Sequence, residues 1–455
     1  MTQELLAPGF TNITQAAVGE VSRRHDEPEW LRQQRLDAWR AYEAMDFPAE
    51  SDEEWRRTDV RSIVFNGIRP YAESAGPRDL PSAIEDVVQG EDTLAGRFVQ
   101  QDSGVVRTEL REDLRAKGVI LMDLHTAARE HPQLVEKYLS NAVKPDEWKY
   151  IALNAAMWSG GCFLYVPKGV VIDAPIHLSF DVSEDGLAVF PHTIVVAERE
   201  TEVTFIDEVT SPDGVAKRFV SGAVEIYAGD GAKLSYYSIN RWGNNVYNFN
   251  TVRARLGRDS QFLCMAAGIG SKLTKMRIDT EMPESGAEAK LLGLTFGDGD
   301  QHFDYNTLQN HFGKHTISDL QFKSAMTDSS SIVWYGITRI NPTAGGSEAN
   351  QTSRNMLLSE HAKAAPIPIL EIEAWDVTKC SHGATAGPVD ENELFYLESR
   401  AIPKDVAEHM LVEGFFADVV DRISDERLRE RVMDAVLQKA GGSAGALTYD
   451  EVLSA

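Results

Sequence analysis

A short motif recurs at intervals of about 30 residues through the middle of the chain, and this spacing constrains the fold more than any other feature. Each copy is a turn, a small or polar residue, one spacer and an apolar residue that starts a β-branched run. The apolar residues of the six copies are Val203, Leu234, Phe262, Leu291, Ile332 and Ala364. The intervals between successive copies are similar, except for a longer one between Leu291 and Ile332. Units of this size cannot bury an apolar face alone, so they are typical of stacked repeats.

Short β-branched runs, separated by Gly, Asp, Ser and Asn, continue from about residue 150 to about residue 378 without helical periodicity. This pattern predicts strands. A parallel β-helix or another β-solenoid fits both the strands and the repeat. A large β-sandwich is the alternative, although turns in a sandwich recur at much shorter intervals. The longer repeat and the lack of hairpin dipeptides favour the solenoid.

Helical patterns dominate residues 1–150. Residues 27–47 have the apolar spacing of an amphipathic helix. Ser51 and Glu54 form a capping-box pattern for a second, short helix. Residues 71–104 are polar and are expected to form a loop.

Helical patterns return after Gly387, where Asp390 is expected to cap a helix. Pro403 is expected to begin another helix. One face of that helix carries Val406, Met410, Phe416, Val420 and Ile423. We therefore divide the chain into a mostly helical region (1–150), a β-helix (151–380) and a C-terminal helical region (381–455).

The bulk composition indicates an ordinary globular protein, with 43% hydrophobic and 25% charged residues among 455. The net charge of −25 argues against binding to nucleic acid or to an anionic membrane. Three widely spaced cysteines suit a reducing compartment. Residues 1–20 lack a secretory pattern, and no apolar run reaches the length of a membrane helix. We expect a cytoplasmic location.

Catalytic signatures are mostly missing. The sequence contains no P-loop motif, so we expect no ATP site in this chain, and it contains no dinucleotide-binding glycine motif. "GGSAG" at Gly441–Gly445 matches the nucleophile-elbow pattern, but it follows a charged helix and favours a linker. No zinc-binding spacing is present. The chain is predicted not to be an enzyme.

An acidic cluster offers one alternative. "FGDGDQHFDYN" contains Asp298, Asp300, His302 and Asp304, and His311 and His315 follow nearby. Carboxylate pairs on a β-helix can serve a polysaccharide lyase or hydrolase, or can bind Ca²⁺. The other interpretation is a solvated turn between strands.

Cys380 and His382 lie two residues apart in "KCSHGATAG". In a strand both side chains project from one face. Two ligands make a poor metal site, because zinc and iron–sulfur centres take about four donors. Further donors would have to come from elsewhere in the fold or from a second chain. Alternatively, Cys380 is a small core residue and His382 a surface group.

A long segment resembles a known family. "LEIEAWDVTKCSHGATAGPVDENELFYLESRAIP" (370–403) resembles the C-terminal signature of the SufB/SufD family, the scaffold proteins of SUF iron–sulfur cluster assembly. Residues 52–59, 153–178 and 350–372 resemble the family's N-terminal helical motif, the entry into its β-helix and its last turns. The likeness covers roughly residues 25 to 440.

The resemblance implies a right-handed parallel β-helix between helical regions, in a complex of SufB, SufD and the ATPase SufC. The β-helices of SufB and SufD pair, and ATP hydrolysis belongs to SufC. A nascent iron–sulfur cluster forms transiently at the interface with the partner chain, and flavin binding stays open. SufC is expected to bind the C-terminal helical region, for which the candidate residues are Phe395, Tyr396, Met410, Phe415 and Phe416.

At two positions this sequence departs from the SufB pattern and resembles the SufD type. The turn that contains "SRNMLL" lacks the SufB cysteine, and Gly383 stands where SufB has a glutamate. The resemblance then places His382 at the interface with SufB, with Cys380 as a weaker companion and as the other candidate metal ligand. A SufB-like chain or a homodimer is the alternative. Glu398 and Ala401 depart from the family's usual Arg and Gly beside the SufC-binding helices.

Overall fold

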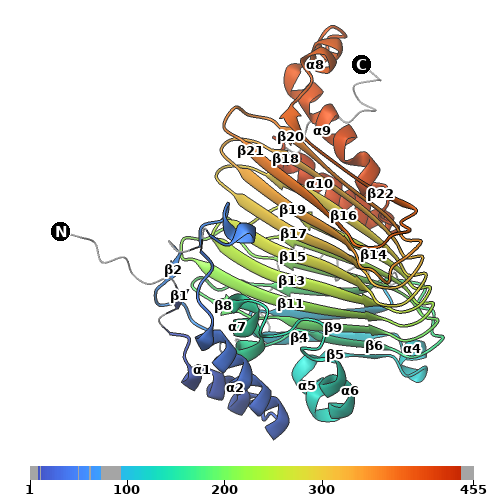
Figure 1. Ribbon diagram of the computed structural model, residues 1–455. Helices are drawn as coiled ribbons and strands as arrows, with labels where there is room; N and C mark the ends of the chain where they lie inside the picture. Colours follow the sequence, from blue (N-terminus) through green and yellow to red (C-terminus); the bar gives the residue numbers. More distant parts are fainter. Residues whose placement is uncertain (1–8, 11, 50, 61–62, 73–93, 442–455) are drawn as a thin grey trace.

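Two long β-sheets form the body of the molecule (Figure 1). This computed structural model describes residues 9–10, 12–49, 51–60, 63–72 and 94–441. From β9 onward, successive long strands alternate between the two sheets, so each turn of the chain adds one strand to each. All neighbouring strands are parallel except for β3 with β4 and β5 with β6. The predicted mainly β, parallel solenoid is therefore confirmed.

We call the sheet that ends in β22 sheet I and the sheet that ends in β21 sheet II. From the last turn backwards, sheet I contains β22 (Lys379–Pro388), β20 (Glu348–Leu357), β18 (Ile317–Met326), β16 (Glu288–Gly297), β14 (Gln261–Gly268), β12 (Lys233–Arg241), β10 (Glu202–Thr210), β7 (Ile176–Asp181), β3 (Gly96–Gln101) and β4 (Gly104–Leu110). Sheet II contains β21 (Lys363–Ile372), β19 (Ser331–Ile340), β17 (His302–His311), β15 (Leu273–Met282), β13 (Val246–Leu256), β11 (Arg218–Ala228), β9 (His192–Ala197), β6 (Cys162–Val166) and β5 (Ile120–Asp123), with β8 (Ala188–Val189) beside β11.

The strand register explains the sequence repeat. Val203, Leu234 and Phe262 are direct cross-strand neighbours in sheet I, as the motif predicts. The next neighbour is Ala289, so Leu291 is two residues out of register. The last two copies, Ile332 and Ala364, pair with each other in sheet II. The motif marks the start of a strand, and each turn of the coil contains two such starts.

Side chains alternate between the space enclosed by the sheets and their outer faces. The enclosed space, which we call the lumen, is filled mainly by large side chains such as Phe205, Tyr236 and Tyr305. This packing makes the solenoid a core rather than a channel over most of its length.

N-terminal elements cover the first turns and the outer face of sheet II. They are β1 (Gly9–Phe10), α1 (Gln15–Arg24), α2 (Glu29–Ala44), the 3₁₀ helix η1 (Glu53–Trp55), β2 (Val64–Phe65), α4 (Glu112–Ala116), α5 (Leu124–Glu130), α6 (Pro132–Tyr138) and α7 (Lys149–Met157). Residues 96–101, predicted to be loop, form β3 because Phe98 and Val99 are fully buried. The rest of that predicted loop falls largely on residues 73–93, outside the described residues.

The predicted capping box does not form. Only the single 3₁₀ turn η1 follows, and its N-cap Asp52 instead accepts a hydrogen bond from the Ala49 amide, at 2.9 Å. A buried polar cluster holds α2 against the solenoid. Arg35 and Glu27 form an ion pair at 2.6 Å, and the rings of His25 and His125 stack at a centroid distance of 3.5 Å.

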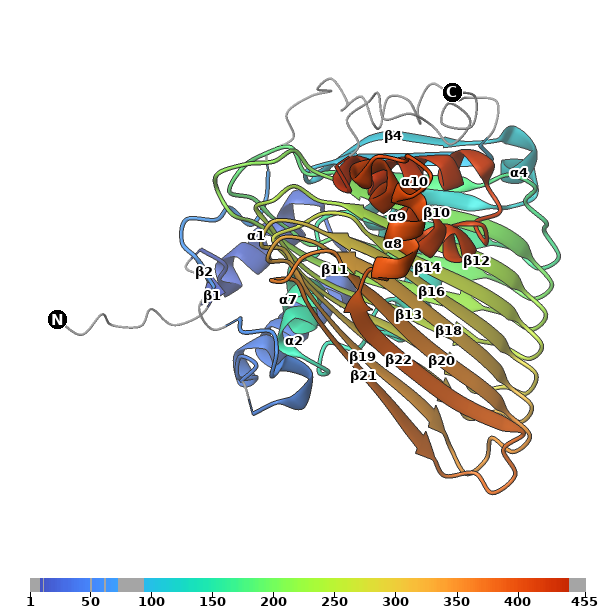
Figure 2. The ribbon, with the colours of Figure 1, turned by 90° about the horizontal axis from the view of Figure 1, so that it is seen from above.

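C-terminal helices pack on the outer face of sheet I, on the other side of the solenoid from α1 and α2 (Figure 2). The packed helices are α9 (Lys404–Val420) and α10 (Glu426–Lys439), and they follow α8 (Glu391–Glu398), which has no buried residue. Pro403 is the N-cap of α9 rather than its first residue. The solenoid ends at Pro388 instead of residue 380, because β22 continues the register of β20 through its small residues. None of the described helices is both long and apolar enough to span a membrane.

Candidate functional site at the open end of the solenoid

Cys380 and His382 lie in β22, the last strand of sheet I. They pair with Ala349 and Gln351 of β20, whose side chains are buried. Both therefore face the lumen, as the two-residue spacing predicts. No further strand of the described chain covers β22, so His382 is exposed at the mouth of the lumen.

Cys380 is the less accessible of the two. It packs against a small apolar cluster that includes Ala349 and Val377. Burial raises the pKa of the Cys380 thiol above its ordinary value of 9.0. The neutral thiol is a poor metal ligand and a poor nucleophile. Of the pair, the imidazole of His382 is the group that a partner can reach.

The lumen below His382 is unusually polar. Gln351 is fully buried, and its side-chain oxygen has no protein partner. The Trp334 indole nitrogen and the Gln309 amide nitrogen, which face the lumen from sheet II, are likewise buried without a protein partner. Buried polar groups normally find a protein or water partner. The last turns of the lumen therefore place several polar atoms without protein partners next to the open end.

The free edges of β21 and β22 at this end differ in the backbone N–H donors that they offer. In β21 the amide of Lys363 donates to Ser330 and that of Glu373 to Ile340, so odd-numbered amides face β19. The even-numbered positions face outwards, because residues of a parallel strand alternate in direction. Pro366 and Pro368 occupy two of them and have no N–H to donate. β22 contains no proline before its last residue, Pro388.

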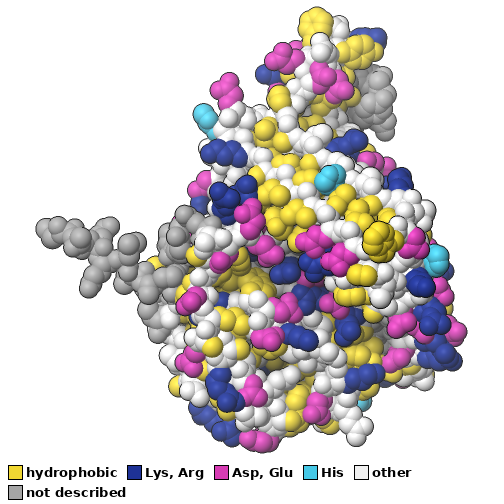
Figure 3. Space-filling view, in the orientation of Figure 1, with side chains coloured by type: hydrophobic (Ala, Val, Ile, Leu, Met, Phe, Trp, Pro, Cys, Tyr) yellow, Lys and Arg dark blue, Asp and Glu magenta, His cyan; other side chains and the backbone are white. Residues whose placement is uncertain are grey.

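Hydrophobic side chains gather beside this end, over β19 and β21 on the outer face of sheet II (Figure 3). Val333, Ile337, Ile367 and Ile369 face outwards there and are half-buried or buried. Trp375, in the turn between β21 and β22, is fully exposed. An exposed tryptophan beside an apolar surface is typical of an interaction site.

The five candidate residues of the C-terminal region fall into two groups. No residue of α8 is buried, and Phe395 and Tyr396 are 70% and 56% exposed. α8 extends beyond the last turn of the solenoid (Figure 1). Met410 and Phe415 are half-buried in α9, whereas Phe416 is fully buried against sheet I. Phe416 therefore fixes α9 to the solenoid, and the partner-accessible aromatic residues are those of α8.

Ion pairs that the sequence did not suggest hold α10 in place. Glu208 of β10 accepts from Arg431 at 2.9 Å and lies 3.2 Å from His177. Burial works to raise the pKa of Glu208, but the His177 hydrogen bond and the Arg431 charge outweigh it and hold the pKa at about 2. Lys439 lies 2.8 Å from Asp298. These contacts join strands to a helix that is distant in the sequence, so no local pattern reveals them.

The predicted acidic cluster does not assemble. Asp298 pairs with Lys439, Asp300 with Lys272, and Asp304 with Lys275. His311 faces the lumen, where it contacts Thr316 and Ser318. Among the described residues, no group of three or more His, Cys, Asp or Glu side chains could hold a metal ion. Of the predicted "GGSAG", only Gly441 lies among the described residues.

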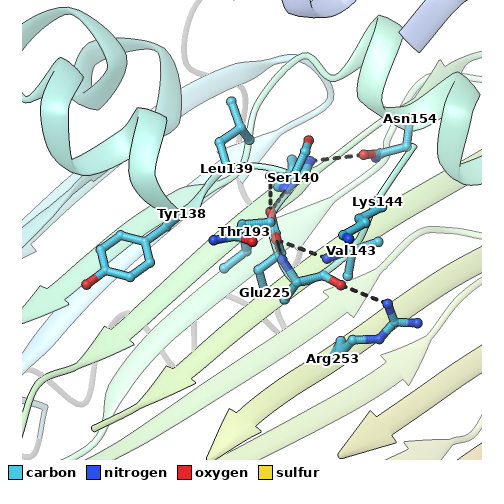
Figure 4. Close-up of polar contacts among 12 residues, drawn as sticks. Tyr138, Leu139, Ser140, Val143, Lys144, Asn154, Thr193, Glu225 and Arg253 are labelled. Carbon is cyan, nitrogen blue, oxygen red and sulfur yellow. Dashed lines mark hydrogen bonds and ion pairs between the residues drawn. The ribbon is translucent and has the colours of Figure 1, made fainter. Parts of the chain in front are cut away.

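A second polar network surrounds Glu225 of β11, whose side chain is fully buried (Figure 4). Its carboxylate accepts from the backbone amides of Ser140, Ala142 and Val143, at 2.6 to 3.1 Å. His192 Nε2 lies 2.8 Å from the same carboxylate. The network fastens the loop after α6 to sheet II. Because it is closed to solvent, its role is structural.

Family models match most of the chain. The model described as SUF system FeS cluster assembly, SufBD core domain, matches residues 180–415, and the model of the SufBD protein N-terminal region matches residues 19–178.

Curated proteins that are similar to this chain carry names of the same family. The iron-sulfur cluster assembly protein SufD of Bacillus subtilis is 32% identical over 94% of this chain and 98% of its own length. SufB of the same organism is 29% identical over 89% of this chain and 88% of its own length. A SufBD family protein of Staphylococcus epidermidis is also 29% identical over 89% of this chain. The chain belongs to the SufB/SufD family of iron–sulfur cluster assembly proteins.

Proposed function

We propose that the chain is a SufD-type, non-enzymatic scaffold subunit, in which the open end binds a second β-helix chain and the C-terminal helices bind the ATPase SufC. The observation that carries this proposal is the uncovered last turn, where the exposed His382 and a free strand edge lie together. The longer and closer match to SufD than to SufB of one organism supports the SufD type.

The free edge of β22 suits strand pairing with another chain, because an uncovered edge offers a row of backbone donors and acceptors. The exposed Trp375 and the apolar side chains over β19 and β21 lie beside it and would add buried area. A SufB-type chain is the partner that we favour, since the family includes both types. A second copy of this chain is the alternative, and it would use the same surface.

His382 is the group through which this chain contributes to a nascent, transient cluster. One imidazole supplies one donor, and an iron–sulfur cluster takes about four. The pairing of two open ends would bring further donors next to His382. Cys380, which is half-buried and protonated at neutral pH, plays a lesser part.

SufC binding is assigned to α8 and the first half of α9, which extend away from sheet I. Phe395 and Tyr396 present two large aromatic surfaces without a described partner that buries them. Aromatic side chains are frequent anchors of protein interfaces. The buried second half of α9 gives this surface a rigid base.

Anaerobic co-expression with SufB-type and SufC-type chains, followed by native mass spectrometry, tests the proposal. We expect a complex with both partners, loss of SufC alone from a Phe395→Ala/Tyr396→Ala variant, and loss of iron without loss of pairing from His382→Ala. Phe312→Ala, at 39% exposure, and His131→Ala, at the far end of the solenoid, are matched controls. A chain that binds neither partner, or a homodimer that ignores a SufB-type chain, would contradict the SufD assignment.

A further inference from the structure

A cavity of about 540 Å³ opens on the outer face of sheet II. Its floor is formed by β15, β17 and β19, and residues from 45–48, 52–55 and 147–149 form its walls. Arg277, Asn306 and Tyr335 lie side by side on this floor as direct cross-strand neighbours. The volume lies within the range of about 300 to 1,000 Å³ that is typical of small-molecule sites.

Asn306 is the feature that points to a ligand. The residue is only 5% exposed, yet neither its amide nitrogen nor its amide oxygen has a protein partner. The indole nitrogen of Trp148, in the wall of the cavity, is also buried without a partner. A buried polar group without a partner destabilises the folded chain, so such groups need an explanation. Asn306 presents a donor and an acceptor side by side, together with one further donor from Trp148.

The cationic side chains that line the cavity are already engaged within the protein. Lys275 lies 2.8 Å from Asp304, and Arg277 lies 3.0 Å from Asp279. Lys149 donates to two backbone carbonyls, at 2.9 and 2.6 Å. Each of these three cations therefore already has a carboxylate or carbonyl partner within the protein.

The rim of the cavity is acidic, because Asp46, Asp52 and Glu53 lie there. Burial, followed by the negative charges of Glu54 and Glu53, raises the pKa of Tyr335 on the cavity floor. A phosphate or carboxylate ligand is therefore disfavoured, and an uncharged ligand fits.

Three aromatic rings complete the cavity. Trp55 is buried and its ring is covered by Lys275, whereas Trp148 and Tyr335 are partly exposed. Planar heterocycles stack on such rings, and an asparagine amide recognises the adjacent donor and acceptor on the edge of a base. We propose that this cavity binds an uncharged nucleobase or nucleoside, with the amide of Asn306 paired to the base edge and the rings of Trp148 and Tyr335 against the base.

Polynucleotides are a poor fit, because the chain carries a net charge of −25 and the rim is acidic. Neutral sugars also use aromatic and amide contacts. Comparing the binding of nucleosides with that of glucose and galactose distinguishes the two ligand classes. The proposal does not rest on the proposed function: no residue of β21, β22 or α8 lines the cavity, although Tyr335 borders the apolar surface over β19 and β21.

The test is a tryptophan-fluorescence titration of the full-length protein with adenosine, cytidine, guanosine and uridine, checked by equilibrium dialysis. We expect at least one nucleoside to bind saturably and its 5′-monophosphate to bind at least tenfold more weakly. Asn306→Leu is expected to weaken binding about tenfold or more. Asn310→Leu is the matched control, because Asn310 lies on the same strand face outside the cavity and has Asn341 as its partner.

Thermal melting shows whether the variant is folded. We expect Asn306→Leu to melt at or above the temperature of the original chain, because it removes two polar atoms without partners. If it fails to fold, Tyr335→Ala on the same floor takes its place. Absence of saturable nucleoside binding, equal binding by Asn306→Leu, tighter binding of the monophosphate, or binding of glucose or galactose instead would each overturn the proposal.

Discussion

Cys380 and His382 share the lumen-facing side of β22, directly beside Ala349 and Gln351 of β20. The first packs into an apolar cluster, and the second is exposed at the lumen mouth. This difference, rather than their proximity in sequence, decides which of them a partner chain can use.

The reactivity of Cys380 follows from its burial. We expect iodoacetamide to modify Cys380 slowly at pH 7 and to reach half of its maximal rate above pH 9, because burial raises the pKa of the thiol. Cys162 and Cys264, which are fully buried, are expected to stay unmodified in the folded chain. Mass spectrometry of peptides from timed reactions measures all three. Fast alkylation of Cys380 at neutral pH would contradict this assignment.

The prolines of β21 are expected to limit pairing of this strand edge with further chains. Replacing Pro366 and Pro368 by alanine restores two outward-facing N–H donors, and a complete free edge favours pairing with further chains. We expect the double variant to form larger assemblies, seen by size-exclusion chromatography with light scattering. Pro283→Ala, in a turn between β15 and β16, is the control. An unchanged mass distribution of the double variant would show that the β21 edge does not control assembly.

Phe416 and Phe395 are expected to differ sharply in their effect on stability. Phe416 is fully buried between α9 and sheet I, so Phe416→Ala is expected to cost about 3 to 5 kcal/mol of unfolding free energy. Phe395 is 70% exposed, and Phe395→Ala is expected to change that free energy by less than about 0.5 kcal/mol. Urea denaturation followed by circular dichroism measures both. Similar losses for the two variants would contradict the packing of α9 on sheet I.

Mild acid is expected to destabilise the N-terminal region through His25. Burial, followed by the charges of His125 and Arg35, lowers its pKa from 6.5 to about 3 in the folded chain. The unfolded chain therefore binds more protons between these values, so stability falls as the pH drops below about 6.5. Glu27, with a pKa of about 2, loses its contribution only below about pH 4.5.

We expect His25→Phe, which keeps an aromatic ring against His125, to show a smaller loss of melting temperature between pH 7 and pH 5 than the original chain. His361→Phe, at an exposed turn, is the control. An equal loss in the His25 variant would mean that the acid sensitivity arises elsewhere.

Much of the architecture was predictable because stacked turns repeat locally. The motif at Val203, Leu234 and Phe262 gave the true register of sheet I, and strand alternation placed Cys380 and His382 on one face. Ile332 and Ala364 were assigned to the same series although they lie in sheet II, because both strands of a turn begin after similar turns.

Long-range packing was not predictable from the sequence. α9 carries apolar residues on more than one face, so nothing in its sequence shows that Phe416 is buried on sheet I while Met410 stays half-exposed. The cavity around Asn306 combines residues from 45–48, 52–55 and 147–149 with three strands, and only the folded chain brings them together. No short-range pattern contains that information.

The two ends of the solenoid differ in how they suit the proposed pairing with another β-helix chain. At the start, the antiparallel strands β4 and β5 turn the chain back on itself, and helices such as α5 pack beside them. At the other end, two prolines weaken one free edge and leave β22 as the edge with its full set of donors. A solenoid that pairs through one end only stops growing after one β-helix partner has been added. The same coil with two such ends would grow into a fibre.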